Sequence, residues 1–168
     1  MHSHKLLTEG LVSLADDFVY LDIEFTFAGD AARKASYRLV FCSPSEDPVA
    51  AETMHSMLKD EINTLCVSVV SFADLEQLEK SYAVENVNPF ARPDNGFILK
   101  YDELNYLYST LVDFMLRVAQ NEDIQILFFS AERKELVATY SRYVKRLTKK
   151  HGLTYIRDGA SYAIRTNH

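Results

Sequence analysis

The sequence predicts an α+β fold: a mixed, largely antiparallel sheet packed by helices, within a single domain spanning residues 1–168. Three observations support this prediction. Apolar and polar residues alternate with a period of two early in the chain, as in a half-buried strand. Two long segments of the second half carry apolar residues at helical spacing. The segment 153–166, "LTYIRDGASYAIRT", has the pattern of a closing hairpin with Asp158 and Gly159 in its turn.

The start of the chain predicts a helix followed by a strand pair. Leu7, Leu11 and Leu14 lie at the spacing of a short amphipathic helix. Residues 18–27, "FVYLDIEFTF", then alternate, and residues 36–43, "SYRLVFCS", are expected to be the hairpin partner after a turn. The face expected to be buried consists of Val19, Leu21, Ile23, Phe25 and Phe27.

The middle of the chain predicts two helices around a buried strand. Asp47 can cap the first helix, with Pro48 at its first position. Residues 64–72, "TLCVSVVSF", have the continuous apolar character of a buried strand. A short helix is expected next, because Ser71 and Asp74 lie at capping-box spacing.

The second half predicts a strand–helix–strand unit. Residues 97–101, "FILKY", are expected to form a short strand, and residues 102–122 form a long amphipathic helix. Residues 124–130, "IQILFFS", have the character of a central strand. Together they can form one parallel, right-handed crossover.

Charge is distributed unevenly along the chain. The net charge is −6, but residues 133–168 carry nine Lys/Arg against two Asp/Glu, which gives +7. Residues 1–132 carry nine Lys/Arg against 22 Asp/Glu, which gives −13 and restores the sum of −6. This asymmetry can direct an anionic partner to the C-terminal end, or it can be simple self-complementarity, with the basic end packing near or binding an acidic region.

Composition predicts a cytoplasmic protein without a membrane segment. No window holds 18 uninterrupted apolar residues, and the N-terminus lacks the pattern of a signal peptide. Cys42 and Cys66 lie in apolar runs and are expected to be small buried thiols, with no disulfide framework. His2 and His4 are expected to belong to a free N-terminal tail.

Asp22 and Glu24 are one residue apart on the alternating segment, so one face of a strand would carry both carboxylates. Two carboxylates in this arrangement can hold divalent metals for phosphoryl transfer. "YLDIEFTF" is similar to the opening motif of DnaQ-like 3′–5′ exonucleases, a resemblance that implies a metal-dependent nuclease. The alternative is that both carboxylates simply occupy the wet side of a sheet. We expect no metal here, because the later aspartate and the closing His or Tyr of that family have no counterpart.

The most distinctive segment is a helix expected from about Ala131 to His151, capped by Ser130 and ended by Gly152. One face should carry Leu136, Tyr140, Tyr143, Val144 and Leu147, and the opposite face Arg142, Lys145, Arg146 and Lys149. Cations near a helix C-terminus favour the helix dipole, which accounts for part of this charge. The functional interpretation is a surface that binds anions. Arg133 in the first turn opposes the dipole. Its stem can lie over the sheet edge with the charge in water, or it can bind an anion or a partner carboxylate.

The succession of strand, helix with "ATYSRY", "HGLTYI" and final hairpin resembles the C-terminal half of GCN5-related N-acetyltransferases (GNAT). The resemblance implies an acyltransferase in which Tyr140 or Tyr143 is the general acid. The chain has five glycines and no Gly-x-Gly turn, so the pyrophosphate loop of that family is absent. The same ending is also similar to small proteins of phages and mobile elements that have no assigned activity.

No complete catalytic constellation is present in the sequence, so we expect a small non-catalytic binding or accessory protein, of the kind that phages or mobile elements encode. Its binding residues are expected on the basic helix and in an irregular loop, residues 83–96, which contains Phe90 and Arg92. A protein partner is expected, with nucleic acid as an alternative through the basic helix. A homo-oligomer is left open, and neither a cofactor nor a membrane is expected. A GNAT-like acyltransferase and a DnaQ-like exonuclease are the competing functions.

Overall fold

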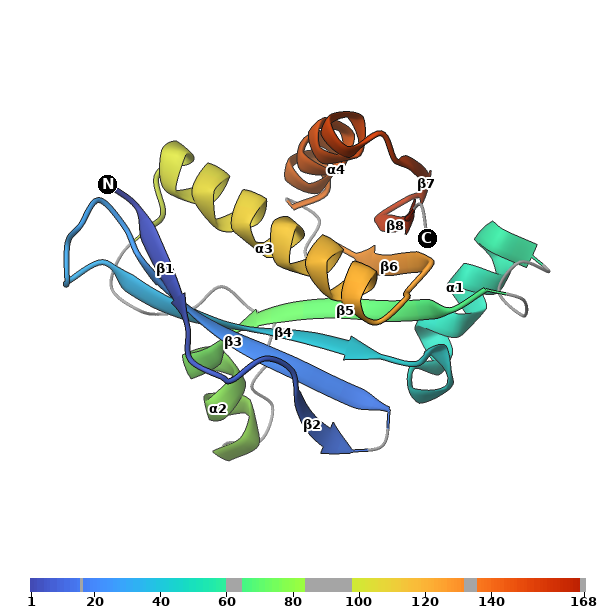
Figure 1. Ribbon diagram of the computed structural model, residues 1–168, viewed down its shortest axis with the longest axis horizontal. Helices are drawn as coiled ribbons and strands as arrows, with labels where there is room; N and C mark the ends of the chain where they lie inside the picture. Colours follow the sequence, from blue (N-terminus) through green and yellow to red (C-terminus); the bar gives the residue numbers. More distant parts are fainter. Residues whose placement is uncertain (16, 60–64, 84–97, 132–135, 167–168) are drawn as a thin grey trace. The chain divides into compact units, whose positions relative to one another are not determined.

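A computed structural model describes residues 1–15, 17–59, 65–83, 98–131 and 136–166 (Figure 1). These residues form an α+β fold with a mixed, mostly antiparallel sheet, as predicted. The strands are β1 (Ser3–Leu6), β2 (Val12–Ala15), β3 (Phe18–Thr26), β4 (Lys34–Cys42), β5 (Val67–Asp74), β6 (Ile126–Ser130), β7 (Thr154–Asp158) and β8 (Ser161–Arg165). The α-helices are α1 (Pro48–Leu58), α2 (Leu75–Ala83), α3 (Tyr101–Asn121) and α4 (Val137–His151).

The strands are hydrogen-bonded in the order β1-β3-β4-β5-β6-β8-β7, and β2 also pairs with β3. β5 pairs with β6 in parallel. The antiparallel pairs are β1 with β3, β2 with β3, β8 with β6 and β8 with β7. The chain divides into two compact units, one formed by residues 1–40 and 72–108 and the other by residues 41–71 and 109–168. No helix among the described residues is long and apolar enough to cross a membrane.

The alternation predicted for β3 is confirmed in part: Val19, expected on the buried face, is half-buried, and Asp22 on the opposite face is buried as well. Leu21, Ile23, Phe25 and Phe27 are all buried, and Phe25 packs edge-on against Tyr37 of β4, with ring centroids 5.9 Å apart. The turn between the strands closes where the Phe27 N–H donates to the Arg33 carbonyl at 3.0 Å. The predicted hairpin of β3 and β4 is therefore confirmed.

The predicted N-terminal helix is wrong, because β1 and β2 occupy this stretch. Both strands add to β3, and the Leu7 N–H donates to the Asp22 carbonyl at 2.8 Å. Gly10 lies between them with a φ of +68°, a conformation that interrupts a helix. The backbone N–H and C=O groups of this stretch form hydrogen bonds with β3 instead of within a helix. Strand pairing with β3 therefore outweighs the helical spacing of the leucines.

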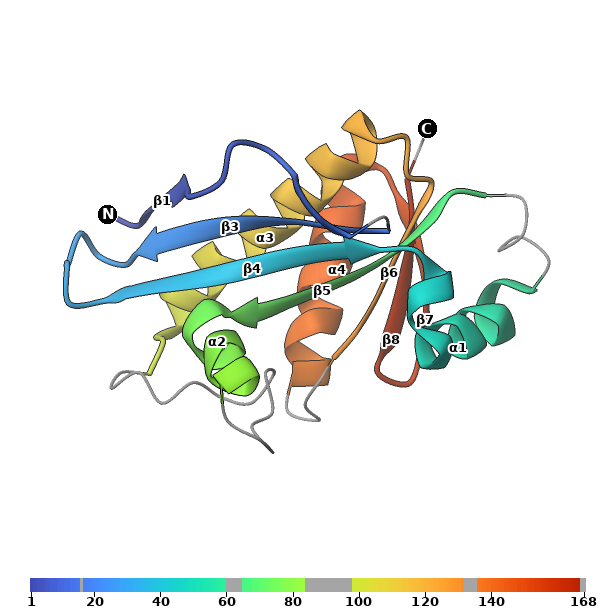
Figure 2. The same ribbon diagram turned by 90° about the horizontal axis from the view of Figure 1, so that it is seen from below.

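The second unit is built around β6, which lies between β5 and β8, as expected for a central strand. α1 begins as predicted, since the Asp47 carboxylate accepts from the Ala50 N–H at 3.1 Å and Pro48 is the first helical residue. α1 packs its Met54 and Leu58 in one cluster with residues of β5, β6 and β8. Figure 2 shows β7 and β8 between α1 and α4.

The prediction of a strand at residues 97–101, "FILKY", is wrong for the residues that the structure describes. Residues 98–100 form no strand, and α3 begins at Tyr101. The Lys100 N–H donates to Glu103 Oε1 at 2.8 Å, which is one half of a capping box. The predicted crossover is therefore wrong as well. The parallel partner of β6 is β5, with Val67 opposite Ile126.

Three boundaries also differ from prediction. Asp74 is a cap of α2, accepting from the Gln77 N–H at 3.1 Å, and Ser71 belongs to β5. α4 spans Val137–His151, and residues 132–135 of its predicted first turn lie outside the described residues; Ser130, the predicted cap, ends β6 and bonds the Ser161 hydroxyl. The final hairpin turns at Gly159 and Ala160, one residue later than expected. Gly152 ends α4 with a φ of +66°, as predicted.

Candidate functional site

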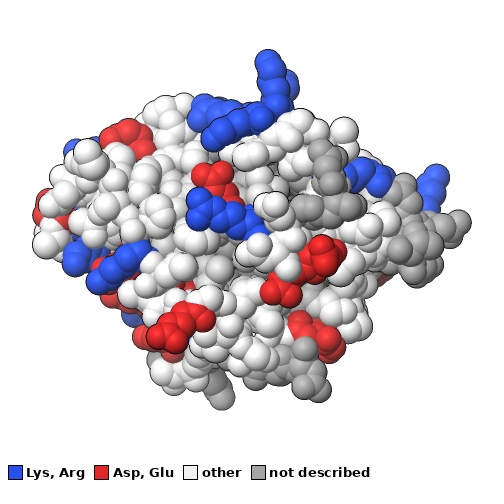
Figure 3. Space-filling model, in the orientation of Figure 1, with Lys and Arg blue, Asp and Glu red and all other residues white. Residues whose placement is uncertain are grey.

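The basic face of α4 consists of Arg142, Lys145, Arg146 and Lys149, and all four residues are exposed, as predicted. Figure 3 shows Lys and Arg side chains gathered over α4. The opposite side of the helix is buried through Tyr140, Tyr143, Val144, Leu147 and Thr148. The helical period of 3.6 residues accounts for this separation, since the two sets differ by half a turn.

Electrostatics within α4 do not explain its basic face. The helix contains no Asp or Glu, so its cations have no acidic partner within the helix. Two like-charged pairs, Arg142 with Arg146 and Lys145 with Lys149, stand one turn apart and repel each other. The dipole stabilises cations only in the last turn, which contains Lys149 but not the other three. The helix dipole therefore stabilises Lys149 alone among these four cations.

The tyrosines of α4 belong to the core. Tyr140 and Tyr143 are 7% and 2% exposed. The Tyr140 ring lies 6.1 Å from that of Phe129 and 6.5 Å from that of Tyr162. The Arg142 and Arg146 guanidinium groups lie 5.4 and 5.6 Å from the Tyr143 ring centroid, which stabilises two of the four cations on the helix surface.

Three of the predicted binding residues, Arg133, Phe90 and Arg92, lie outside the described residues. The other five of the eight predicted binding residues lie together on α4: Tyr140, Arg142, Lys145, Arg146 and Lys149. Four of these form the exposed basic face, and Tyr140 lies beneath them in the core.

Both carboxylates of β3, Asp22 and Glu24, form ion pairs with basic side chains. Asp22 is buried, and both of its oxygens accept from Arg38, at 2.8 Å from Nε and 3.0 Å from Nη2. The Glu24 carboxylate lies 3.5 Å from Lys5 Nζ and 3.8 Å from Lys34 Nζ. The hydrogen bond to Asp22 also raises the pKa of Arg38. Within the described parts of the chain, no group of three His, Cys, Asp or Glu residues could hold a metal ion.

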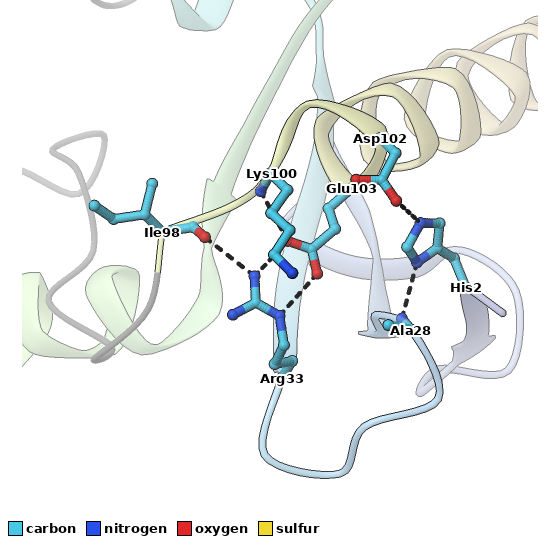
Figure 4. A network of polar contacts seen from close by, with 7 residues as sticks. All are labelled: His2, Ala28, Arg33, Ile98, Lys100, Asp102 and Glu103. Atoms are coloured by element: carbon cyan, nitrogen blue, oxygen red, sulfur yellow. Dashed lines mark hydrogen bonds and ion pairs between the residues drawn. The ribbon is translucent and has the colours of Figure 1, made fainter.

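A polar network in the first unit was missed by the sequence prediction (Figure 4). The prediction that His2 and His4 form a free tail is wrong. His2 Nε2 lies 2.9 Å from the Asp102 carboxylate, and His2 Nδ1 accepts from the Ala28 N–H at 2.9 Å. Because a backbone N–H can only donate, the ring proton must be on Nε2. The hydrogen bond from His2 lowers the pKa of Asp102.

Glu103 is the buried centre of this network, and its side chain is 1% exposed. Arg33 donates from Nε to Glu103 Oε2 at 2.8 Å and from Nη2 to the other oxygen, while Nη2 also donates to the Ile98 carbonyl at 3.1 Å. The hydrogen bond from Arg33 lowers the pKa of Glu103. One local signal existed in the sequence: an acid three residues after Lys100, the spacing of a capping box.

The two cysteines differ from the prediction. Cys66 is exposed and Cys42 is half-buried, and both are free thiols. Burial raises the pKa of Cys42 to about 11, with Asp47 and Glu46 adding to the effect. Cys66 belongs to the apolar run 64–72 but precedes β5, which begins at Val67, and its N–H donates to the Gln125 side chain at 2.9 Å.

The candidate residues differ in their surroundings. The β3 carboxylates are paired with cations, the α4 tyrosines lie in the core, and the α4 cations face solvent. The basic face of α4 is therefore the candidate functional site. Comparison of the chain with known proteins found no matching family, no similar curated protein and no similar solved structure.

Proposed function

We propose that this chain is a non-catalytic accessory protein that binds an acidic protein partner through the basic face of α4. One observation carries the proposal. α4 has no carboxylate and five exposed Lys and Arg residues, of which the four on its basic face stand in two rows; three of these four precede the last turn, where the helix dipole acts. Neither Lys145 nor Lys149 forms an ion pair within the described residues, so their charge is available to a partner.

The arrangement of the cations suits carboxylates from another chain. Like charges one turn apart destabilise a helix by roughly 0.2–0.5 kcal/mol per pair, and a partner's carboxylates would relieve this repulsion. At a rise of about 1.5 Å per residue, the row from Arg142 to Lys149 extends over roughly 10 Å. That length allows several contacts with one acidic segment.

The aromatic residues of α4 favour a protein partner over single-stranded nucleic acid. Binding of single strands commonly relies on exposed rings on which bases stack. Tyr140 and Tyr143 are buried and cannot serve this purpose. The basic face supplies charge alone, which matches carboxylates presented by a folded or extended protein segment.

The experiment measures binding of a fluorescent poly-glutamate peptide by anisotropy. Arg142→Glu combined with Arg146→Glu should weaken binding at least about tenfold, since each contact contributes up to about 1 kcal/mol and reversal adds repulsion. The matched control combines Lys80→Glu with Arg117→Glu, two exposed cations on other helices, and should change affinity little.

Equal loss in both double variants would attribute binding to net charge and refute the α4 site. Single-stranded DNA of the same charge is the comparison ligand. If it binds more tightly than the peptide, with a steep salt dependence that the α4 variant flattens, nucleic acid replaces the protein partner.

A further inference from the structure

β7 offers a second recognition element in the same unit as α4. It is the last strand in the hydrogen-bonded order, and no other described strand pairs with its outer edge. Thr154, Tyr155, Arg157 and Asp158 are exposed, and Ile156 is half-buried. An edge strand presents a row of backbone donors and acceptors to which another strand can add.

The strand register shows which backbone groups of β7 point outward. The Thr166 N–H donates to the Gln125 carbonyl at 2.9 Å, so even-numbered residues of the final strand bond toward β6. The odd-numbered residues therefore bond toward β7, and the pairs are Thr154–Arg165, Ile156–Ala163 and Asp158–Ser161. The backbone groups of Tyr155 and Arg157 consequently point to the open edge.

The two faces of β7 differ in their surroundings. Tyr155 and Arg157 lie opposite Ile164 and Tyr162, and Tyr162 contacts α4 through the Val137 carbonyl at 3.0 Å. The Arg157 guanidinium lies 5.9 Å from the Tyr162 ring centroid. Ile156 instead packs with the apolar cluster of α1. A strand added to β7 would thus meet the Arg157 side chain on the face where Tyr162 contacts α4, and an apolar margin at Ile156 on the other face.

Charge decides which strand fits this edge. Residues 137–166 carry seven Lys/Arg and one Asp, a net charge of +6. A second copy of the chain would bring the same +6 against it, which opposes self-pairing. An acidic strand is attracted by the same field, so the edge is suited to a partner and not to a second copy.

We infer that the acidic partner binds as an extended segment that adds one strand to β7. This inference rests on the proposed function and gives it a binding mode. The fitting segment alternates Asp or Glu with apolar residues over about five positions, the length of β7. Its acidic side chains lie on the side of Arg157 and α4, and its apolar side chains lie next to Ile156.

The test uses a labelled 11-residue peptide of alternating Glu and Val, and the same peptide with its five central amides N-methylated. N-methylation removes backbone donors and blocks strand pairing while it leaves the charge unchanged. The unmodified peptide should bind at least tenfold more tightly. It should also slow hydrogen exchange of the Tyr155 and Arg157 amides, measured by NMR on the full chain.

The outcomes separate this inference from the proposed function. If both peptides bind equally, the Tyr155 and Arg157 amides stay unprotected and the α4 double variant abolishes binding, then the strand mode is refuted and the α4 site stands. If neither alternating peptide binds while poly-glutamate still binds through Arg142 and Arg146, the strand mode is refuted and the α4 site stands; if poly-glutamate does not bind either, both proposals fail. If the two amides are protected without peptide and sedimentation shows a dimer, a second copy occupies the edge and the acidic strand is excluded.

Discussion

Arg33 donates from Nε to Glu103 Oε2 at 2.8 Å and thereby joins the turn after β3 to the start of α3, 70 residues apart in sequence. The same carboxylate accepts the Lys100 N–H at 2.8 Å. One buried acid thus caps a helix and attaches a hairpin to it (Figure 4). Both roles depend on its negative charge, which makes Glu103 a sensitive position for stability.

Glu103→Ala should destabilise the fold by about 2 kcal/mol, because it removes the cap of α3 and leaves the half-buried Arg33 guanidinium without its carboxylate acceptor. The change is measured as the urea midpoint of unfolding. Glu52→Ala, an exposed acid within α1, is the control and should shift the midpoint little. Equal shifts would show that the network around Glu103 adds nothing to stability.

Stability should fall in acid partly through Glu103. Arg33 lowers the pKa of this carboxyl in the folded state, so its stabilisation is fully present above the unfolded pKa of about 4.3. It is lost as the pH falls through the lower folded value. Glu103→Gln has no such titration. The stability difference between the wild type and this variant should therefore shrink from about pH 7 to about pH 3.5, and a constant difference would contradict the ion pair.

The two thiols should react at very different rates. At about pH 8 roughly one thousandth of Cys42 is thiolate, because its pKa is raised to about 11, and the side chain is half-buried. Cys66 is exposed and should react first with a disulfide reagent. In Cys66→Ser the fast phase should disappear, and Cys42 should react only slowly until urea is added. Two fast thiols in the wild type would contradict the described burial.

Arg38→Gln should destabilise the fold by about 2 kcal/mol, since it leaves the buried Asp22 carboxylate without its cation and the site is only partly exposed to water. Asp22→Asn added to Arg38→Gln should recover part of this loss.

Millimolar Mg²⁺ should not raise the melting temperature of the wild type, because both Asp22 oxygens accept from Arg38. A rise in the wild type that Asp22→Asn abolishes would support the nuclease interpretation instead.

Acetyl-CoA should give no saturable heat in calorimetry. The two tyrosines that the acetyltransferase resemblance would place at the leaving thiolate, Tyr140 and Tyr143, are buried in the core. The sequence also has no Gly-x-Gly turn for the pyrophosphate. Micromolar binding that Tyr140→Phe weakens would contradict the proposed binding function and favour an acyltransferase.

Local patterns were sufficient for the elements whose signals are local. Most of the alternation of β3, the cap of α1 at Asp47 and the Gly152 stop of α4 appeared where the sequence predicted them. The basic face of α4 was predictable for the same reason, since a helical period sorts residues onto faces without help from other segments. In each case neighbours within about four residues supply the determining interactions.

Only the tertiary structure decided features that depend on distant partners. The stretch around Leu7 was expected to be helical, but it pairs with β3 instead. Ile98 was expected in a strand, but it lies outside any strand, next to the cap of α3. The burial of Glu103 against Arg33 likewise requires segments 70 residues apart to meet. The sequence by itself determined periodicity, caps and charge, which are short-range properties. Strand pairing and buried ion pairs are long-range, and their free energy appears only when the chain has folded.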